Sequence, residues 1–78
     1  MKKWEVNYGE NKIVVENRVG CERLYVNGEL QDERIGLSFT SRLYGQLSAG
    51  ENIKVSLGGG WFTMQCRIFV NHRLVLPK

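Results

Sequence analysis

The side chains best suited to surface chemistry are aromatic and basic residues that alternate near the C-terminus. Trp61, Arg67 and Phe69 fall on one face of a predicted strand, because every second side chain of a strand points the same way. Arg23 and Tyr25 repeat the pattern in the first half of the chain. Exposed aromatic rings beside arginine suit stacking on nucleic-acid bases or sugars, and each stacked base contributes about 1–3 kcal/mol. We therefore expect these residues to form a binding surface.

The same aromatic residues have a simpler interpretation. In a small β-sandwich they cover sheet edges or form a contact between copies, because a chain of 78 residues buries only about 60–65% of the surface that its unfolded form exposes. Aromatic residues are also enriched at protein–protein interfaces. The sequence therefore leaves two functions open: binding of a protein partner or a second copy, and binding of a nucleic acid or glycan.

The sequence contains no complete catalytic or metal-binding pattern. His72, the only histidine, falls in a predicted turn, where a solvated side chain is a more frequent arrangement than a general base. Cys66 lies among apolar residues and Cys21 precedes the acidic Glu22, so neither thiol has the surroundings of a nucleophile. The glycine run at 58–60 leads into a strand, whereas a phosphate-binding loop requires a helix there. We expect no enzyme activity, no cofactor and no metal site.

Alternation of apolar and polar residues with a period of two predicts an all-β chain. The longest such run extends from Trp61 to Val70, with Phe62, Met64 and Cys66 on its apolar face. Alanine, the strongest helix former, occurs once. The predicted strands cover residues 4–8, 12–16, 23–26, 35–39, 43–47, 53–57, 61–70 and 74–76.

Turn-forming residues separate these strands. Asn27-Gly28 predicts the tightest hairpin, because a type I′ turn needs positive φ at both central residues and this pair tolerates it best. We expect this turn to pair residues 23–26 with residues 29–32. Asn71-His72 is a second candidate, since both residue types are tolerated in the left-handed region.

The two halves of the chain resemble each other. Residues 23–30 (RLYVNGEL) follow the same order of residue types as residues 67–74 (RIFVNHRL) at an offset of 44, and residues 12–15 match residues 52–55 at an offset of 40. An internal duplication predicts two similar hairpin units packed face to face. The alternative is a chance likeness, because short amphipathic hairpins have similar patterns.

One known family has hairpins of this kind. The strand KIVVE at 12–16, the connection at Gly20 and the segment RLYVNGE at 23–29 resemble the repeated hairpin of the Fas apoptosis inhibitory molecule family, and the likeness continues through residues 43–45, 53–55 and 62–71. The chain departs from that family's pattern at residues 17–19 and at the Asn71-His72 turn. The resemblance implies a compact eight-stranded β-sandwich that acts as a non-catalytic interaction module.

Composition limits the partner and the location. The net charge of +3 comes from 11 basic and 8 acidic residues that alternate in sign along the chain, which favours solubility over a dedicated polyanion site. No apolar stretch approaches the ~20 residues that span a bilayer. Because we expect Cys21 and Cys66 to be reduced, we predict a cytoplasmic protein that does not bind membranes.

These patterns predict one domain over residues 1–78, an antiparallel β-sandwich of about eight strands built from two similar hairpin units. The favoured function is a non-catalytic module for protein interaction or self-association, with nucleic-acid or glycan binding through the aromatic and basic residues as the alternative. The predicted core consists of Val6, Ile13, Val15, Leu24, Val26, Leu37, Phe39, Leu43, Val55, Leu57, Phe62, Met64, Ile68 and Val70.

Overall fold

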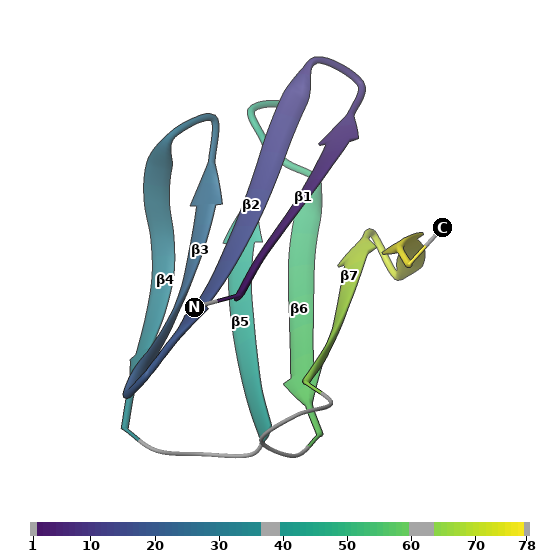
Figure 1. The fold of residues 1–78 in the computed structure, drawn as a ribbon. Coiled ribbons are helices and arrows are strands. Elements are labelled where there is room, and N and C mark those ends of the chain that lie inside the picture. Colours follow the sequence, from purple (N-terminus) through teal and green to yellow (C-terminus); the bar gives the residue numbers. More distant parts are fainter. Residues whose placement is uncertain (1, 37–39, 60–63, 78) are drawn as a thin grey trace.

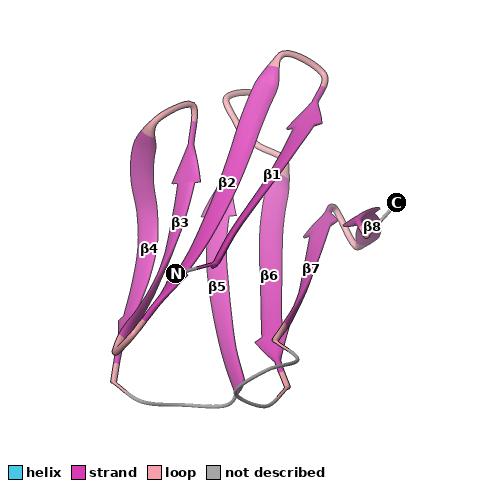
Figure 2. Cartoon of the chain, in the orientation of Figure 1, coloured by secondary structure: helices cyan, strands magenta, loops and turns pink. Residues whose placement is uncertain are grey.

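The computed structural model describes residues 2–36, 40–59 and 64–77, and these residues form strands and no helix (Figure 2). The all-β prediction is therefore confirmed. The strands are β1 (Lys2–Tyr8), β2 (Asn11–Arg18), β3 (Cys21–Val26), β4 (Glu29–Ile35), β5 (Thr40–Gln46), β6 (Asn52–Gly58), β7 (Gln65–Val70) and β8 (Arg73–Leu76).

The strands form two antiparallel sheets of four, each a simple meander. The first sheet has the order β1-β2-β3-β4 and the second has the order β5-β6-β7-β8, so sequence neighbours pair throughout. Figure 1 shows the first sheet in front of the second, with β1 and β2 crossing over β5 and β6. The predicted sandwich of two similar units is confirmed.

The core lies between the two sheets, and β2, β3, β6 and β7 supply most of it by burying alternate side chains, whereas β4 and β8 bury none completely. On β6 and β7 the buried positions alternate strictly with exposed or half-buried ones. The buried apolar residues are Val6, Ile13, Val15, Leu24, Val26, Leu43, Leu47, Ile53, Val55, Leu57, Cys66, Ile68 and Val70. At about 1.5–3 kcal/mol for each fully buried aliphatic side chain, this layer is the main source of stability.

Most of the predicted core is confirmed, with three kinds of difference. Met64 is half-buried and packs against the core from its rim. Leu47 and Ile53 are buried although the prediction left them out. The remaining predicted core residues, Leu37, Phe39 and Phe62, lie outside the described residues.

Two predicted strand boundaries differ from the structure. A strand running from Ile35 through Gly36 is wrong, because β4 ends at Ile35 and Gly36 has a φ of +127°. The predicted pairing of residues 23–26 with residues 29–32 continues as far as Cys21 and Ile35 in the structure, so Ile35 ends β4 and does not begin a new strand. The long strand predicted from Trp61 is described only from Gln65 onward, and residues 61–63 lie outside the described part.

Both predicted asparagine turns adopt positive φ. Asn27 and Gly28 have φ values of 52° and 84°, and Asn71 and His72 have values of 48° and 69°. Each asparagine also ties its hairpin to a neighbouring strand. The Lys12 amide donates to Asn27 Oδ1 at 2.9 Å, and in the second unit the Asn52 amide donates to Asn71 Oδ1 at 3.0 Å.

These two hydrogen bonds occupy equivalent places in the two units. In each unit the backbone N–H of the asparagine also donates to the backbone carbonyl of the same partner residue, Lys12 or Asn52, at 2.9 Å. Lys12 and Asn52 are also the first residues of the two segments that match in sequence at the shorter offset. The internal resemblance therefore extends from residue types to hydrogen-bond geometry.

Side chains of β4 cover the free edge of β5, where the two sheets approach each other. An edge strand presents backbone groups that have no strand partner. Three hydrogen bonds satisfy such groups here: Tyr44 N to Asp32 Oδ2 at 2.9 Å, Gln46 N to Gln31 Oε1 at 3.3 Å, and Arg34 Nε to the Arg42 carbonyl at 3.1 Å. Side chains of the first sheet therefore hold β5 in place.

Gly45 lets the strands approach at this junction. A Cβ atom at this position would lie 3.1 Å from Gln31 Cβ and from Leu24 Cδ2, which is tighter than ordinary packing.

A further polar contact joins the two sheets near this junction. The Ser41 hydroxyl donates to Glu22 Oε1 at 2.5 Å, and Glu22 is the buried charged residue of the described chain, at 4% exposure. The bond matters because a buried carboxylate without a partner is strongly destabilising.

A substitution at Gly28 tests the turn. We expect Gly28→Val to lower the free energy of unfolding by about 1 kcal/mol or more, because a β-branched residue at positive φ is strained. A Cβ atom there meets nothing within 4 Å, so backbone strain is the only local cost. Gly28→Asn is the control and should cost less, since asparagine tolerates this region. Equal urea midpoints for the two variants would contradict the prediction.

A substitution at Asp32 tests the β4–β5 junction. We expect Asp32→Ala to destabilise the protein by about 1 kcal/mol, because the Tyr44 amide loses its acceptor. Hydrogen exchange at the Tyr44 amide should accelerate as well. Glu29→Ala, on the same strand but at an exposed position, is the matched control and should leave both quantities unchanged. An unchanged exchange rate in Asp32→Ala would show that the bond does not hold the edge.

Candidate binding face

The outward side of the second sheet carries aromatic and basic side chains in two neighbouring rows, and we call it the β5–β8 face. Strand register places Tyr44, Lys54, Phe69 and Leu74 side by side across β5, β6, β7 and β8. The next row consists of Arg42, Ser56 and Arg67. Successive residues of one row lie about 4.8 Å apart, the spacing of neighbouring strands.

The charge on this face has one sign. Arg42, Lys54 and Arg67 are exposed, and no ion pair joins any of them to a carboxylate within the described chain. The outward positions that the structure describes on β5 to β8 hold no acidic residue. The three positive charges are therefore available to a partner.

The rings of the face are accessible to different degrees. Tyr44 is 51% exposed and Leu74 is 45% exposed, whereas Phe69 is half-buried between its neighbours. Lys54 Nζ lies 4.9 Å from the centre of the Phe69 ring. A cation–π contact at an exposed site contributes only about 0.5–1 kcal/mol, so a partner that offers more can displace the lysine.

The predicted site residues fall on two opposite surfaces. Arg67 and Phe69 lie on the β5–β8 face, and Trp61 lies outside the described residues. Arg23 and Tyr25 point outward from the first sheet, so the sandwich separates them from the other pair. The alternation predicted for β7 holds at these positions: Phe69, expected on the outward face, is more exposed than Ile68, a predicted core residue that is fully buried.

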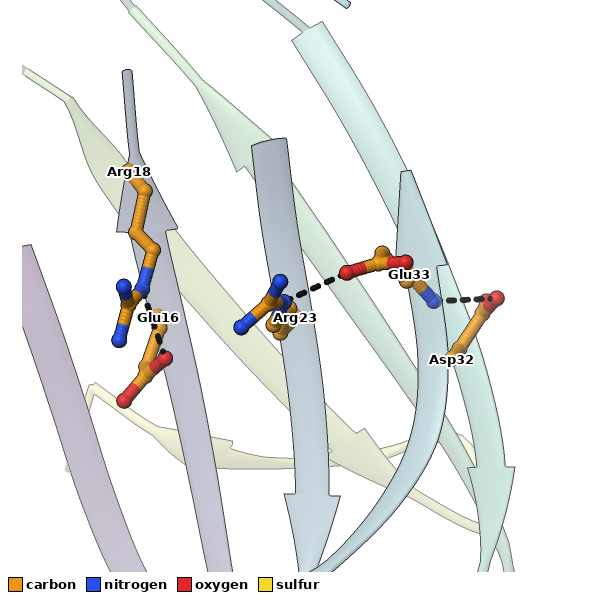
Figure 3. A network of polar contacts seen from close by, with 5 residues as sticks. All are labelled: Glu16, Arg18, Arg23, Asp32 and Glu33. Carbon is orange, nitrogen blue, oxygen red and sulfur yellow. Dashed lines mark hydrogen bonds and ion pairs between the residues drawn. The ribbon is translucent and has the colours of Figure 1, made fainter. Parts of the chain in front are cut away.

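The outward side of the first sheet is also charged, but its charges are paired; we call it the β1–β4 face. Arg23 Nε contacts Glu33 Oε2 at 2.5 Å and Arg18 Nε contacts Glu16 Oε1 at 3.2 Å (Figure 3). Glu5 lies between two lysines, at 3.1 Å from Lys3 and 3.7 Å from Lys12. Each of these basic side chains therefore contacts a carboxylate of its own sheet, although the two lysines share Glu5.

The titration behaviour follows from these pairs. The hydrogen bond to Glu33, and then the one to Tyr25, raises the pKa of the Arg23 guanidinium above its usual range. The contact with Lys3 and the charge of Lys12 lower the pKa of the Glu5 carboxyl. Each shift stabilises the charged form, as a paired ion requires. Arg23 therefore forms an ion pair with Glu33 of its own sheet.

The sequence pattern did not indicate Tyr44, Arg42 and Lys54 as members of the face. The signal was the distribution of acidic residues: Glu51 is the only one after Glu33. The prediction that charges alternate in sign holds for the first sheet and is wrong for the second. A charge count for each half would have shown which sheet carries unneutralised cations.

The chain's potential nucleophiles and bases do not converge in the described structure. Cys66 is buried, and burial raises the pKa of its thiol to about 12. His72 is exposed in the β7–β8 turn, and Cys21 is half-buried on the outward side of β3. In residues 2–36, 40–59 and 64–77, no group of three or more histidine, cysteine or acidic side chains gathers around a common point.

An open hollow of about 430 Å³ lies where the β3–β4 turn meets the end of β5. Its polar lining includes Gln31 and Gln46, and the backbone N–H of Gln46 already donates to Gln31 Oε1.

The described residues contain no helix that is long and apolar enough to cross a membrane. Comparisons with protein-family models, curated proteins and solved structures found no match to this chain. The resemblance to the Fas apoptosis inhibitory molecule family stays a prediction.

The two thiols should react at different rates. Cys21 is half-buried, whereas Cys66 is 6% exposed and its raised pKa keeps it protonated at pH 8. We expect iodoacetamide to label Cys21 first in the native protein and both thiols once the protein is unfolded. Cys21→Ala is the control and should remove the fast reaction. Absence of free thiols in the unfolded protein, or equal native rates, would contradict this.

Proposed function

We propose that the protein is a non-catalytic binding module that takes an anionic partner on its β5–β8 face. The observation that carries the proposal is the set of three exposed cations, Arg42, Lys54 and Arg67, with no described carboxylate paired to them. A surface with one sign of charge attracts partners of the opposite sign and speeds their association.

The contrast between the two sides of the sandwich supports this assignment. The β1–β4 face also carries arginine side chains, but Glu33 pairs with Arg23 and Glu16 pairs with Arg18. Exposed ion pairs of this sort add only about 0–1 kcal/mol to stability, and they leave little field for a ligand. Binding through cations is therefore a property of the second sheet.

The charge pattern argues against self-association through the β5–β8 face. Two copies in contact there would place arginine and lysine side chains opposite one another, and like charges across an interface cost several kcal/mol. A neutral glycan would leave the cations unused. The predicted resemblance to a family of interaction modules agrees with a non-catalytic role. We also propose a cytoplasmic location, since two unpaired cysteines fit a reducing compartment.

Retention on a phosphorylated cation-exchange matrix tests the proposal. We expect the double variant Arg42→Gln, Arg67→Gln to elute at clearly lower salt than the native protein, because the matrix then loses two of its three contacts. The matched control is Arg18→Gln, Arg23→Gln, which has the same net charge but alters the β1–β4 face. It should elute later than the first variant. Equal elution would show that net charge alone determines binding, and would overturn the proposal.

A further inference from the structure

We propose that the partner of the β5–β8 face is a single-stranded nucleic acid, whose bases stack on Tyr44 and Phe69 while its phosphates contact Arg42 and Arg67. This inference rests on the proposed function and adds the chemical class of the partner. Proteins that bind single strands combine a cationic surface with aromatic side chains on which bases stack.

The arrangement of the four side chains suits a repeating ligand. Arg42 precedes Tyr44 by two residues on β5, and Arg67 precedes Phe69 by two residues on β7. Each arginine therefore lies on the same face as its ring, about 7 Å along the strand. The register through β6 places the two rings in one row and the two guanidinium groups in the next, and the pairs are about 10 Å apart.

Lys54 lies between the two pairs and complements them. Its ammonium group covers the Phe69 ring in the unbound protein, at 4.9 Å from the ring centre. An exposed cation–π contact is weaker than the stacking of a base on the same ring. A base can therefore replace the ammonium group, which is then free to contact a phosphate.

The shape of the surface favours a single strand over a duplex. In a duplex the bases are stacked inside, and sequence-reading proteins insert a helix or a narrow β-ribbon into the major groove. The β5–β8 face is one side of a four-stranded sheet, and the described chain holds no helix. Its rings can meet only bases that are splayed out from their own strand.

The other sheet provides a natural comparison within the same molecule. Arg23 and Tyr25 have the same spacing as Arg67 and Phe69 and occupy the corresponding strand. A leucine lies beside each ring in the strand register, Leu30 beside Tyr25 and Leu74 beside Phe69, but Glu33 pairs with Arg23 alone. The ring and arginine motif is therefore present on both faces, but only the β5–β8 face leaves its arginines free of a described carboxylate.

Fluorescence anisotropy with a labelled oligothymidylate of about 12 nucleotides tests the inference, because known single-strand binders occupy about 4–16 nucleotides per domain. We expect Phe69→Leu and Tyr44→Leu each to weaken binding about 5- to 100-fold, since leucine keeps an apolar side chain and removes the stacking surface. Tyr25→Leu is the matched control on the β1–β4 face and should leave the Kd unchanged. Thermal melting of each variant verifies that it is folded.

Salt dependence gives a second reading of the same complex. With three cations in contact with phosphates, the logarithm of the association constant should fall with the logarithm of salt concentration with a slope of about −2. Arg42→Gln, Arg67→Gln should reduce that slope to about −0.7, whereas Phe69→Leu should weaken binding without changing it. A duplex of the same length should bind more weakly than the single strand.

Labelled polyglutamate separates the inference from the function on which it rests. If polyglutamate binds through Arg42 and Arg67, and neither ring variant affects either probe, the anionic face stands and the nucleic-acid inference is overturned. If neither probe binds, or if Arg42→Gln, Arg67→Gln leaves both affinities unchanged, the proposed function is overturned as well. Weaker binding of oligothymidylate alone by the ring variants supports the inference.

Discussion

Strand register is the constraint on which both faces of this protein depend. A slip of one residue would move every outward side chain into the core, so the register must be fixed. Asn27 and Asn71 contribute to this, because each adopts positive φ in a tight turn while its side chain accepts the amide of the strand beside the hairpin. Those bonds link three strands at one end of each sheet. By fixing the register, they also fix which side chains point outward: Arg67 and Phe69 on one sheet, and Arg23 and Tyr25 on the other.

The two units share this scaffold and differ in what covers it. Glu5, Glu16 and Glu33 lie among the cations of the first sheet and form ion pairs with them. The outward positions described on the second sheet include Arg42, Lys54 and Arg67 and hold no acidic residue. Because exposed ion pairs contribute little to stability, the acidic residues of the first sheet matter mainly for its surface potential. Two similar hairpin units thus present one face whose cations are paired with carboxylates and one face whose cations are not.

Local patterns predicted the strands, the two asparagine turns and most of the core, because each depends on residues near one another in sequence. Other features depend on how far each pairing extends and on pairing between separate strands. The polar β4 continues beyond the predicted residues 29–32 to Ile35, because its pairing with β3 continues to Cys21. Tyr44, Lys54 and Phe69 come from three separate strands, so only the register reveals that they form one row. Trp61 was predicted from alternation alone and lies outside the described residues.

The cationic face depends on the first sheet for its shape. Tyr44 and Arg42 lie on an edge strand, and an edge strand that lacks a neighbour has amides and carbonyls open to solvent or to another chain. Asp32 and Arg34 of β4 occupy two of those groups, on the same residues whose side chains belong to the binding rows. Gly45 lets this contact be close, since a larger residue would press on Leu24 and Gln31. The acidic and polar residues of β4 therefore serve two ends: they protect the edge of β5 from pairing with other chains, and they hold one half of the candidate binding face in position against the other.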